Sequence, residues 1–163
     1  ILDSVLPTRI KNVLVFGSMD KIPGNTALTK LFHENYSDFR VSTMSLQKFY
    51  KNIWEEINQN SQDELYQNKK WYALYTAVKN ESIIFFSNSN YLLTRDISVL
   101  SIIFVMFYPL MSKFPYIYYN YKVHIYFIII WIITTYAAHK TGEKFANNVL
   151  IENYIKGANH EHS

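Results

Sequence analysis

Two apolar runs decide the fold of this chain: ISVLSIIFVMFYPLMS at residues 97–112 and VHIYFIIIWIITTYAAH at residues 123–139. Between the runs lie Lys113 and Lys122, the only charged residues of this stretch. A spanning helix needs roughly 20 apolar residues to cross about 30 Å of hydrocarbon. The runs have 16 and 17 residues, and each lysine can lengthen its span by extending an aliphatic stem towards the headgroups. The pattern therefore predicts a transmembrane hairpin over residues 96–140.

The link between the runs is rich in tyrosine, at positions 116, 118, 119 and 121. Tyrosine favours the membrane–water interface, because its ring is apolar and its hydroxyl is wet. These residues resemble an aromatic belt. The alternative is a helical hairpin buried inside a larger soluble assembly, and the residues alone leave it open.

The basic residues near the hairpin indicate its orientation. Arg95, Lys140 and Lys144 lie at the outer ends, against Lys113 and Lys122 in the link. Basic residues favour the cytoplasmic side of a membrane. We therefore predict a multi-pass protein of the cell membrane, with its head and tail in the cytoplasm.

Composition excludes several classes of site. The chain has no cysteine, which excludes a disulfide framework, zinc–thiolate sites and a cysteine nucleophile. Its formal net charge of +3 is too small to be a nucleic-acid signature by itself. In residues 1–95, eleven Lys and Arg stand against nine Asp and Glu, so the charge of the head is nearly balanced.

The chain divides into a head domain (1–95), the transmembrane hairpin (96–140) and a C-terminal helix with a tail (141–163). The predicted fold class is mainly α, with a small helical cytoplasmic head, and the chain is expected to be homo-oligomeric. The clearest helix of the head begins at Ser45, because its apolar positions follow the three-and-four spacing of an amphipathic helix. A second helix covers residues 64–78, after a capping box that starts at Ser61.

Two earlier segments of the head are less determined. Residues 11–16, KNVLVF, predict either a strand or a first helical turn. Pro23 and Gly24 predict a turn, after which Asn25 or Thr26 caps a brief helix.

No catalytic constellation is apparent. Phe16-Gly17-Ser18 resembles the entry to a nucleotidyltransferase active site, but Asp20 has no partner at Asp-x-Asp spacing, so two-metal chemistry lacks its ligands. No P-loop or GxGxxG motif occurs. We predict a protein that is not an enzyme, with no catalytic residue, metal site or cofactor.

The first apolar run carries a hydroxylated stripe. Its members recur at intervals of 3, 4, 3 and 4 and share one helix face: Ser98, Ser101, Val105, Tyr108 and Ser112. In a membrane such a face either packs against another helix or faces water. Two helices cannot enclose water, so the second option requires several chains around an axis, with these residues lining a pore. Both options remain open.

The segment before the first run also carries a family resemblance. Residues 88–96, NSNYLLTRD, resemble an Asn-x-x-Tyr-Gly-Phe-x-Arg-Asn junction, with Leu92-Leu93 in place of Gly-Phe. This junction is found in small bacterial two-pass proteins that are encoded beside nucleotidyltransferases. The chain is thus similar to the membrane effectors of Hailong-type antiphage defence systems. The resemblance implies a homo-oligomeric ion channel, a homotetramer, whose cytoplasmic head binds an oligodeoxyadenylate made by the partner nucleotidyltransferase; the ligand holds the pore closed.

Cations and aromatic faces of the head suit a single-stranded DNA ligand. The candidate ligand-binding residues are Arg95, Lys69, Lys70, Arg9 and Lys11. Arg95 is the strongest, because a ligand at the junction would act directly on the first span. The alternative from another class is a non-conducting membrane anchor or adaptor that presents the head to a soluble partner.

Overall fold

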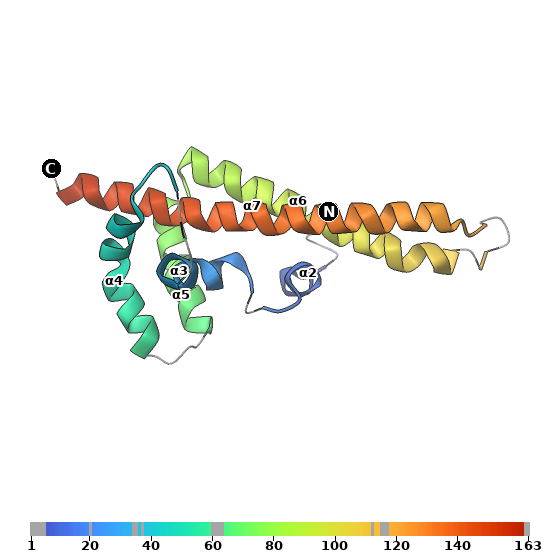
Figure 1. Ribbon diagram of the computed structural model, residues 1–163, viewed down its shortest axis with the longest axis horizontal. Helices are drawn as coiled ribbons and strands as arrows, with labels where there is room; N and C mark the ends of the chain where they lie inside the picture. Colours follow the sequence, from blue (N-terminus) through green and yellow to red (C-terminus); the bar gives the residue numbers. More distant parts are fainter. Residues whose placement is uncertain are drawn as a thin grey trace. The chain divides into compact units, whose positions relative to one another are not determined.

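The computed structural model describes residues 6–19, 21–33, 36, 38–59, 64–111, 113–114 and 118–161. The described chain is mainly helical, as predicted, and contains no β-strand beyond an isolated bridge between Asp38 and Val41. Figure 1 shows its helices: α2 (Thr8–Phe16), α3 (Pro23–His33), α4 (Thr43–Gln59), α5 (Glu64–Val78), α6 (Ser82–Met111) and α7 (Tyr121–Glu161).

The chain forms two compact units. Unit 1 comprises residues 1–19 and 89–141, and unit 2 comprises residues 20–88 and 142–163. These boundaries differ from the predicted domains, because the N-terminal segment belongs with the hairpin and the C-terminal segment belongs with the head helices. Helices α6 and α7 each contribute to both units.

The two long helices extend well beyond the apolar runs. Helix α6 begins 14 residues before Asp96, and α7 continues through the C-terminal segment as one helix of 41 residues. The C-terminal segment, predicted as a helix with a tail, is the continuation of α7 up to Glu161. No proline lies between residues 121 and 156 to interrupt α7, and the helix continues through its one glycine in that range, Gly142. Both helices, over Ser82–Met111 and Tyr121–Ala158, are long and apolar enough to cross a membrane.

Helix α2 resolves the ambiguity of residues 11–16 in favour of a helix. It ends at Gly17, which adopts a left-handed φ of 76° and donates its N–H to the carbonyl oxygen of Val13 at 2.8 Å. Glycine accepts this conformation without steric cost, which makes it a common C-terminal cap.

Unit 2 is built from α3, α4, α5, the start of α6 and the end of α7. Leu46, Tyr50 and Ile57 form the buried face of α4, as the periodicity predicted. The Tyr50 hydroxyl donates to the carbonyl oxygen of Leu150 in α7 at 2.7 Å. Burial raises the pKa of this phenol well above its ordinary value.

The predicted turn at Pro23 and Gly24 is wrong, because α3 begins at Pro23. Proline is favoured in the first turn of a helix, where its missing N–H would have no partner. Gly24 instead permits a close approach: a Cβ at this position would lie 2.7 Å from Cε3 of Trp71 on α5. Ser61, the start of the predicted capping box, lies outside the described residues.

Candidate functional site

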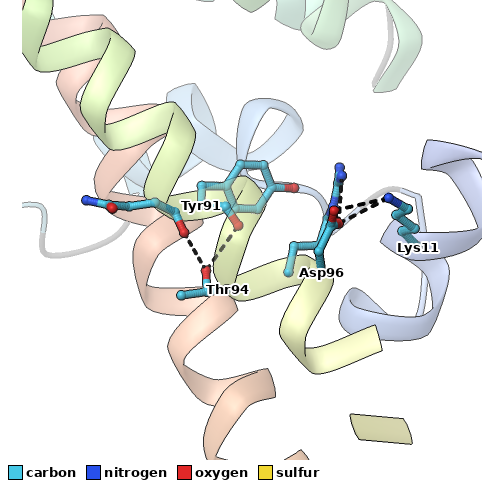
Figure 2. A network of polar contacts seen from close by, with 6 residues as sticks. Lys11, Tyr91, Thr94 and Asp96 are labelled. Atoms are coloured by element: carbon cyan, nitrogen blue, oxygen red, sulfur yellow. Dashed lines mark hydrogen bonds and ion pairs between the residues drawn. The ribbon is translucent and has the colours of Figure 1, made fainter. Parts of the chain in front are cut away.

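A buried ionic cluster connects α2 and α6 within unit 1 (Figure 2). Lys11 reaches from α2 to the carboxylate of Asp96, with its Nζ 3.2 Å from each carboxylate oxygen. Arg95 donates to the same carboxylate, with Nη2 3.0 Å from Oδ1. The Lys11 side chain is fully buried and that of Arg95 is 3% exposed, whereas Asp96 keeps 22% exposure. One carboxylate thus binds two cations that have little access to water.

The cluster is surrounded by aromatic and hydroxyl groups of the same unit. The guanidinium of Arg95 lies 5.8 Å from the ring centroid of Tyr91, a cation–π distance. Thr94 donates to the carbonyl oxygens of Asn90 and Tyr91, and Figure 2 shows it beside Tyr91. The Thr94 hydroxyl also lies 2.6 Å from that of Thr141 on α7.

A second contact holds α2 against α7. The imidazole Nε2 of His139 is 3.0 Å from the carbonyl oxygen of Val15, and the His139 ring packs edge-on against Phe16 at 4.6 Å. Phe16 also contacts Tyr91 on α6. The cluster and this aromatic contact together position α2 on both helices of the hairpin.

The five candidate ligand residues are divided between the units. Arg9, Lys11 and Arg95 belong to unit 1, where only Arg9 is exposed. Lys69 and Lys70 lie on α5 in unit 2. Lys11 and Arg95 therefore lie together, because both bind the carboxylate of Asp96. Their charged groups are engaged in these contacts.

The two lysines of α5 have different surroundings. Lys69 is exposed, whereas Lys70 pairs with the carboxylate of Glu56 on α4 and lies 5.4 Å from the ring centroid of Tyr66. The hydrogen bond from Lys70 lowers the pKa of Glu56, and the same bond raises the pKa of Lys70. Lys69 is the more accessible of the two to a ligand.

The hydroxylated stripe lies largely inside the hairpin. Ser98 is 1% exposed and its hydroxyl is 2.7 Å from that of Thr135 on α7. Ser101 is 7% exposed and donates to the carbonyl oxygen of Ile97. In this conformation the two serines serve packing, which is one of the two options that the spacing left open.

The remaining members of the stripe lie nearer the link. Val105 is half-buried. The half-buried Tyr108 accepts a hydrogen bond from the Asn120 N–H at 3.2 Å, and its ring contacts those of His124 and Phe127. Ser112 lies outside the described residues.

The sequence did not single out His139 or Thr141, and it did not predict the pairing of Ser98 with Thr135 or of Lys11 and Arg95 with Asp96. Asp96 marked the boundary of the low-charge stretch and the end of the segment at residues 88–96. A signal was nevertheless present: an acidic residue directly before an apolar span requires a cation if it is to be buried. No group of three or more His, Cys, Asp or Glu that could hold a metal ion occurs among the residues described.

Comparison of this chain with models of protein families, with curated proteins and with solved structures finds no match. The features of the chain that bear on its function are therefore its helical arrangement, its two apolar helices and the ionic cluster beside them.

Proposed function

We propose that this chain is a membrane effector that forms a gated ion channel as a homo-oligomer, regulated by an oligonucleotide bound outside the membrane. The observation that carries the membrane location is the exposure of the apolar surface. Of the most apolar 18-residue stretch of α7 only 6% is buried, and of the corresponding stretch of α6 only 28% is buried. The core helix of a soluble domain would bury most of this surface, because exposing it to water costs about 25 cal/mol per Å².

The oligomer follows from the size of the hairpin. Two helices cannot surround a column of water, so a conducting path needs several copies around an axis, and the family resemblance suggests four. The conformation described here buries Ser98 and Ser101, which fits a closed state. On opening, the contact between the hydroxyls of Ser98 and Thr135 would be replaced by contacts with water or with another copy of the chain.

The proposed ligand is an oligodeoxyadenylate supplied by a partner nucleotidyltransferase, as the resemblance suggests. Exposed Lys69 suits a phosphate, and Tyr72 on the same helix is 61% exposed and offers an aromatic face for a base. Lys11 and Arg95 act differently in this proposal. Their shared carboxylate lies at the start of the first span, so they transmit a change in the head to the hairpin.

Ion flux tests the channel directly. Purified protein in liposomes is expected to pass ions, and added oligodeoxyadenylate is expected to reduce the flux. Ser101→Leu should lower the flux while the protein still elutes as the same oligomer, because the larger side chain fills the proposed path. The matched control is Phe104→Leu, at a side chain that is 52% exposed on the outer surface, and it should leave the flux unchanged. Liposomes that pass no ions with or without the oligonucleotide would contradict a channel.

One observation favours a second function, a non-conducting two-pass anchor that presents unit 2 to a soluble partner. Ser98 and Ser101 are packed inside the hairpin, and the large side chains exposed on the described parts of the two apolar runs are hydrophobic, including two methionines. An anchor requires only such a surface. It predicts no flux, and full membrane retention of Ser101→Leu.

A further inference from the structure

Helix α2 buries two polar side chains together with the apolar Val15 and Phe16, and it exposes two apolar side chains. Lys11 is 0% exposed and Asn12 is 8% exposed, whereas Ile10 and Val13 are 46% and 42% exposed. Ile10 and Val13 are three residues apart and share a face. A helix on the surface of a soluble protein places its apolar stripe towards the core and polar groups outward, so the exposure of Ile10 and Val13 departs from that pattern. The exposed side of α2 thus combines the apolar pair Ile10 and Val13 with the polar Thr8 and Arg9 at the start of the helix.

The contacts of α2 define its level along the hairpin. Lys11 binds Asp96, the residue directly before the first apolar run. The carbonyl oxygen of Val15 contacts His139, the last residue of the second apolar run. Both partners lie where the apolar runs meet the polar part of the chain. Helix α2 thus lies at the end of the spans that is opposite the link.

We infer that α2 is a membrane-interface helix whose outward face, Ile10 and Val13, is covered by lipid. The inference rests on the proposed membrane location of the hairpin. Exposed apolar side chains of α6 lie on both sides of Asp96, the partner of Lys11: Leu93 is 59% exposed and Ile97 is 40% exposed, so the exposed apolar surface of α6 reaches the level of α2. An interfacial helix of this kind buries its apolar face about 5–10 Å into the boundary between headgroups and acyl chains.

The charged residues of α2 fit this position. Exposed Arg9 adjoins Ile10 and can bind an anionic lipid headgroup, since a cation near such a surface gains about 1 kcal/mol. Lys11 points the other way and pairs with Asp96, which keeps both charges off the lipid. Ionisable residues at membrane depth generally pair with one another inside the protein.

Site-directed spin labelling tests this inference, and the chain suits the method because it contains no cysteine. Single variants Ile10→Cys and Val13→Cys are labelled in the full chain and reconstituted into vesicles of phosphatidylcholine and phosphatidylglycerol. Collision rates with oxygen, which concentrates in lipid, and with a water-soluble nickel chelate then report depth. Ile129→Cys, at an exposed position in the second run, is the lipid reference, and Lys69→Cys is the water reference.

The expected oxygen-to-nickel ratio at positions 10 and 13 is several-fold above that of Lys69→Cys and below that of Ile129→Cys. A ratio equal to the water reference, with Ile129→Cys still in lipid, would overturn the inference and leave the membrane location intact. Low collision with both reagents would also overturn it, because it would indicate a second copy of the chain against α2. A water-like ratio at Ile129→Cys itself would overturn the membrane location.

Discussion

The buried carboxylate of Asp96 supports a quantitative prediction. Asp96→Asn keeps the size of the side chain but removes the negative charge that binds Lys11 and Arg95. Removing one member of a buried ion pair costs about 3–5 kcal/mol, because the remaining charge is stranded in a poorly solvated site. We expect the lower end, about 3 kcal/mol, since Asp96 keeps partial contact with water. For a chain of this length each kcal/mol shifts Tm by about 2–4 °C, so Asp96→Asn should lower Tm by about 6–12 °C.

Thermal unfolding in detergent, followed by circular dichroism, measures this shift. The matched control is Glu55→Gln, the same chemical change in a pair with Lys51 whose side chains are 67% and 55% exposed. An exposed pair of this spacing is worth about 0.3–0.5 kcal/mol, so the control should change Tm by about 1–2 °C.

A third variant separates stranded charge from lost packing. Lys11→Met removes one cation and leaves Arg95 paired with Asp96, so its Tm should fall less than that of Asp96→Asn. The reasoning is refuted if Asp96→Asn and Glu55→Gln lower Tm equally. It is also refuted if Lys11→Met is the more damaging change, because packing and not charge would then be the dominant effect.

Three further predictions concern unit 2. Burial raises the pKa of Tyr50, so the contribution of its neutral phenol to stability is complete below about pH 10 and is lost as pH rises further. Tyr50→Phe should lower the free energy of unfolding by about 1 kcal/mol at pH 7, because the hydrogen bond to the Leu150 carbonyl is lost. Unfolding measured against pH should then show a smaller loss of stability at alkaline pH. Gly24→Ala should destabilise by about 1–3 kcal/mol in chemical unfolding, because the new methyl group meets the Trp71 ring; an increase in stability would contradict that close approach. Hydrogen bonds from Arg40 hold the pKa of Asp38 below its usual range. The contribution of the Asp38 carboxylate to stability is therefore present above about pH 4 and is lost as pH falls. Asp38→Asn should reduce the loss of stability in acid, and an unchanged dependence of unfolding on acid pH would contradict this prediction.

Local patterns predicted much of the helical content. The spacing of Leu46, Tyr50 and Ile57 predicted α4, and these residues are its buried face. A repeat of three and four residues depends only on the geometry of one helix, so it can be read without knowing the partner. The continuity of α7 was not predicted, because composition changes from apolar to mixed near residue 140 and Gly142, a poor helix former, stands at that change.

The candidate site was predicted only in part. Arg95 and Lys11 were identified as cations of interest, but their common partner was not. Lys11 and Asp96 are separated by 85 positions, and a contact of this separation leaves no periodic trace in a single sequence. The hydroxylated stripe was found at Ser98 and Ser101, whereas its partner Thr135 became apparent only in the folded hairpin.

By itself, the sequence determined that the chain is helical and that two segments are too apolar to be left in water. Hydropathy and helical period are local properties, and each apolar run carries them whatever it packs against. Only the tertiary structure decided which side chains of those segments face one another and which face outward. That decision depends on contacts between distant residues: the pairing of Lys11 with Asp96 holds the Lys11 side of α2 inward and leaves Ile10 and Val13 on the outside.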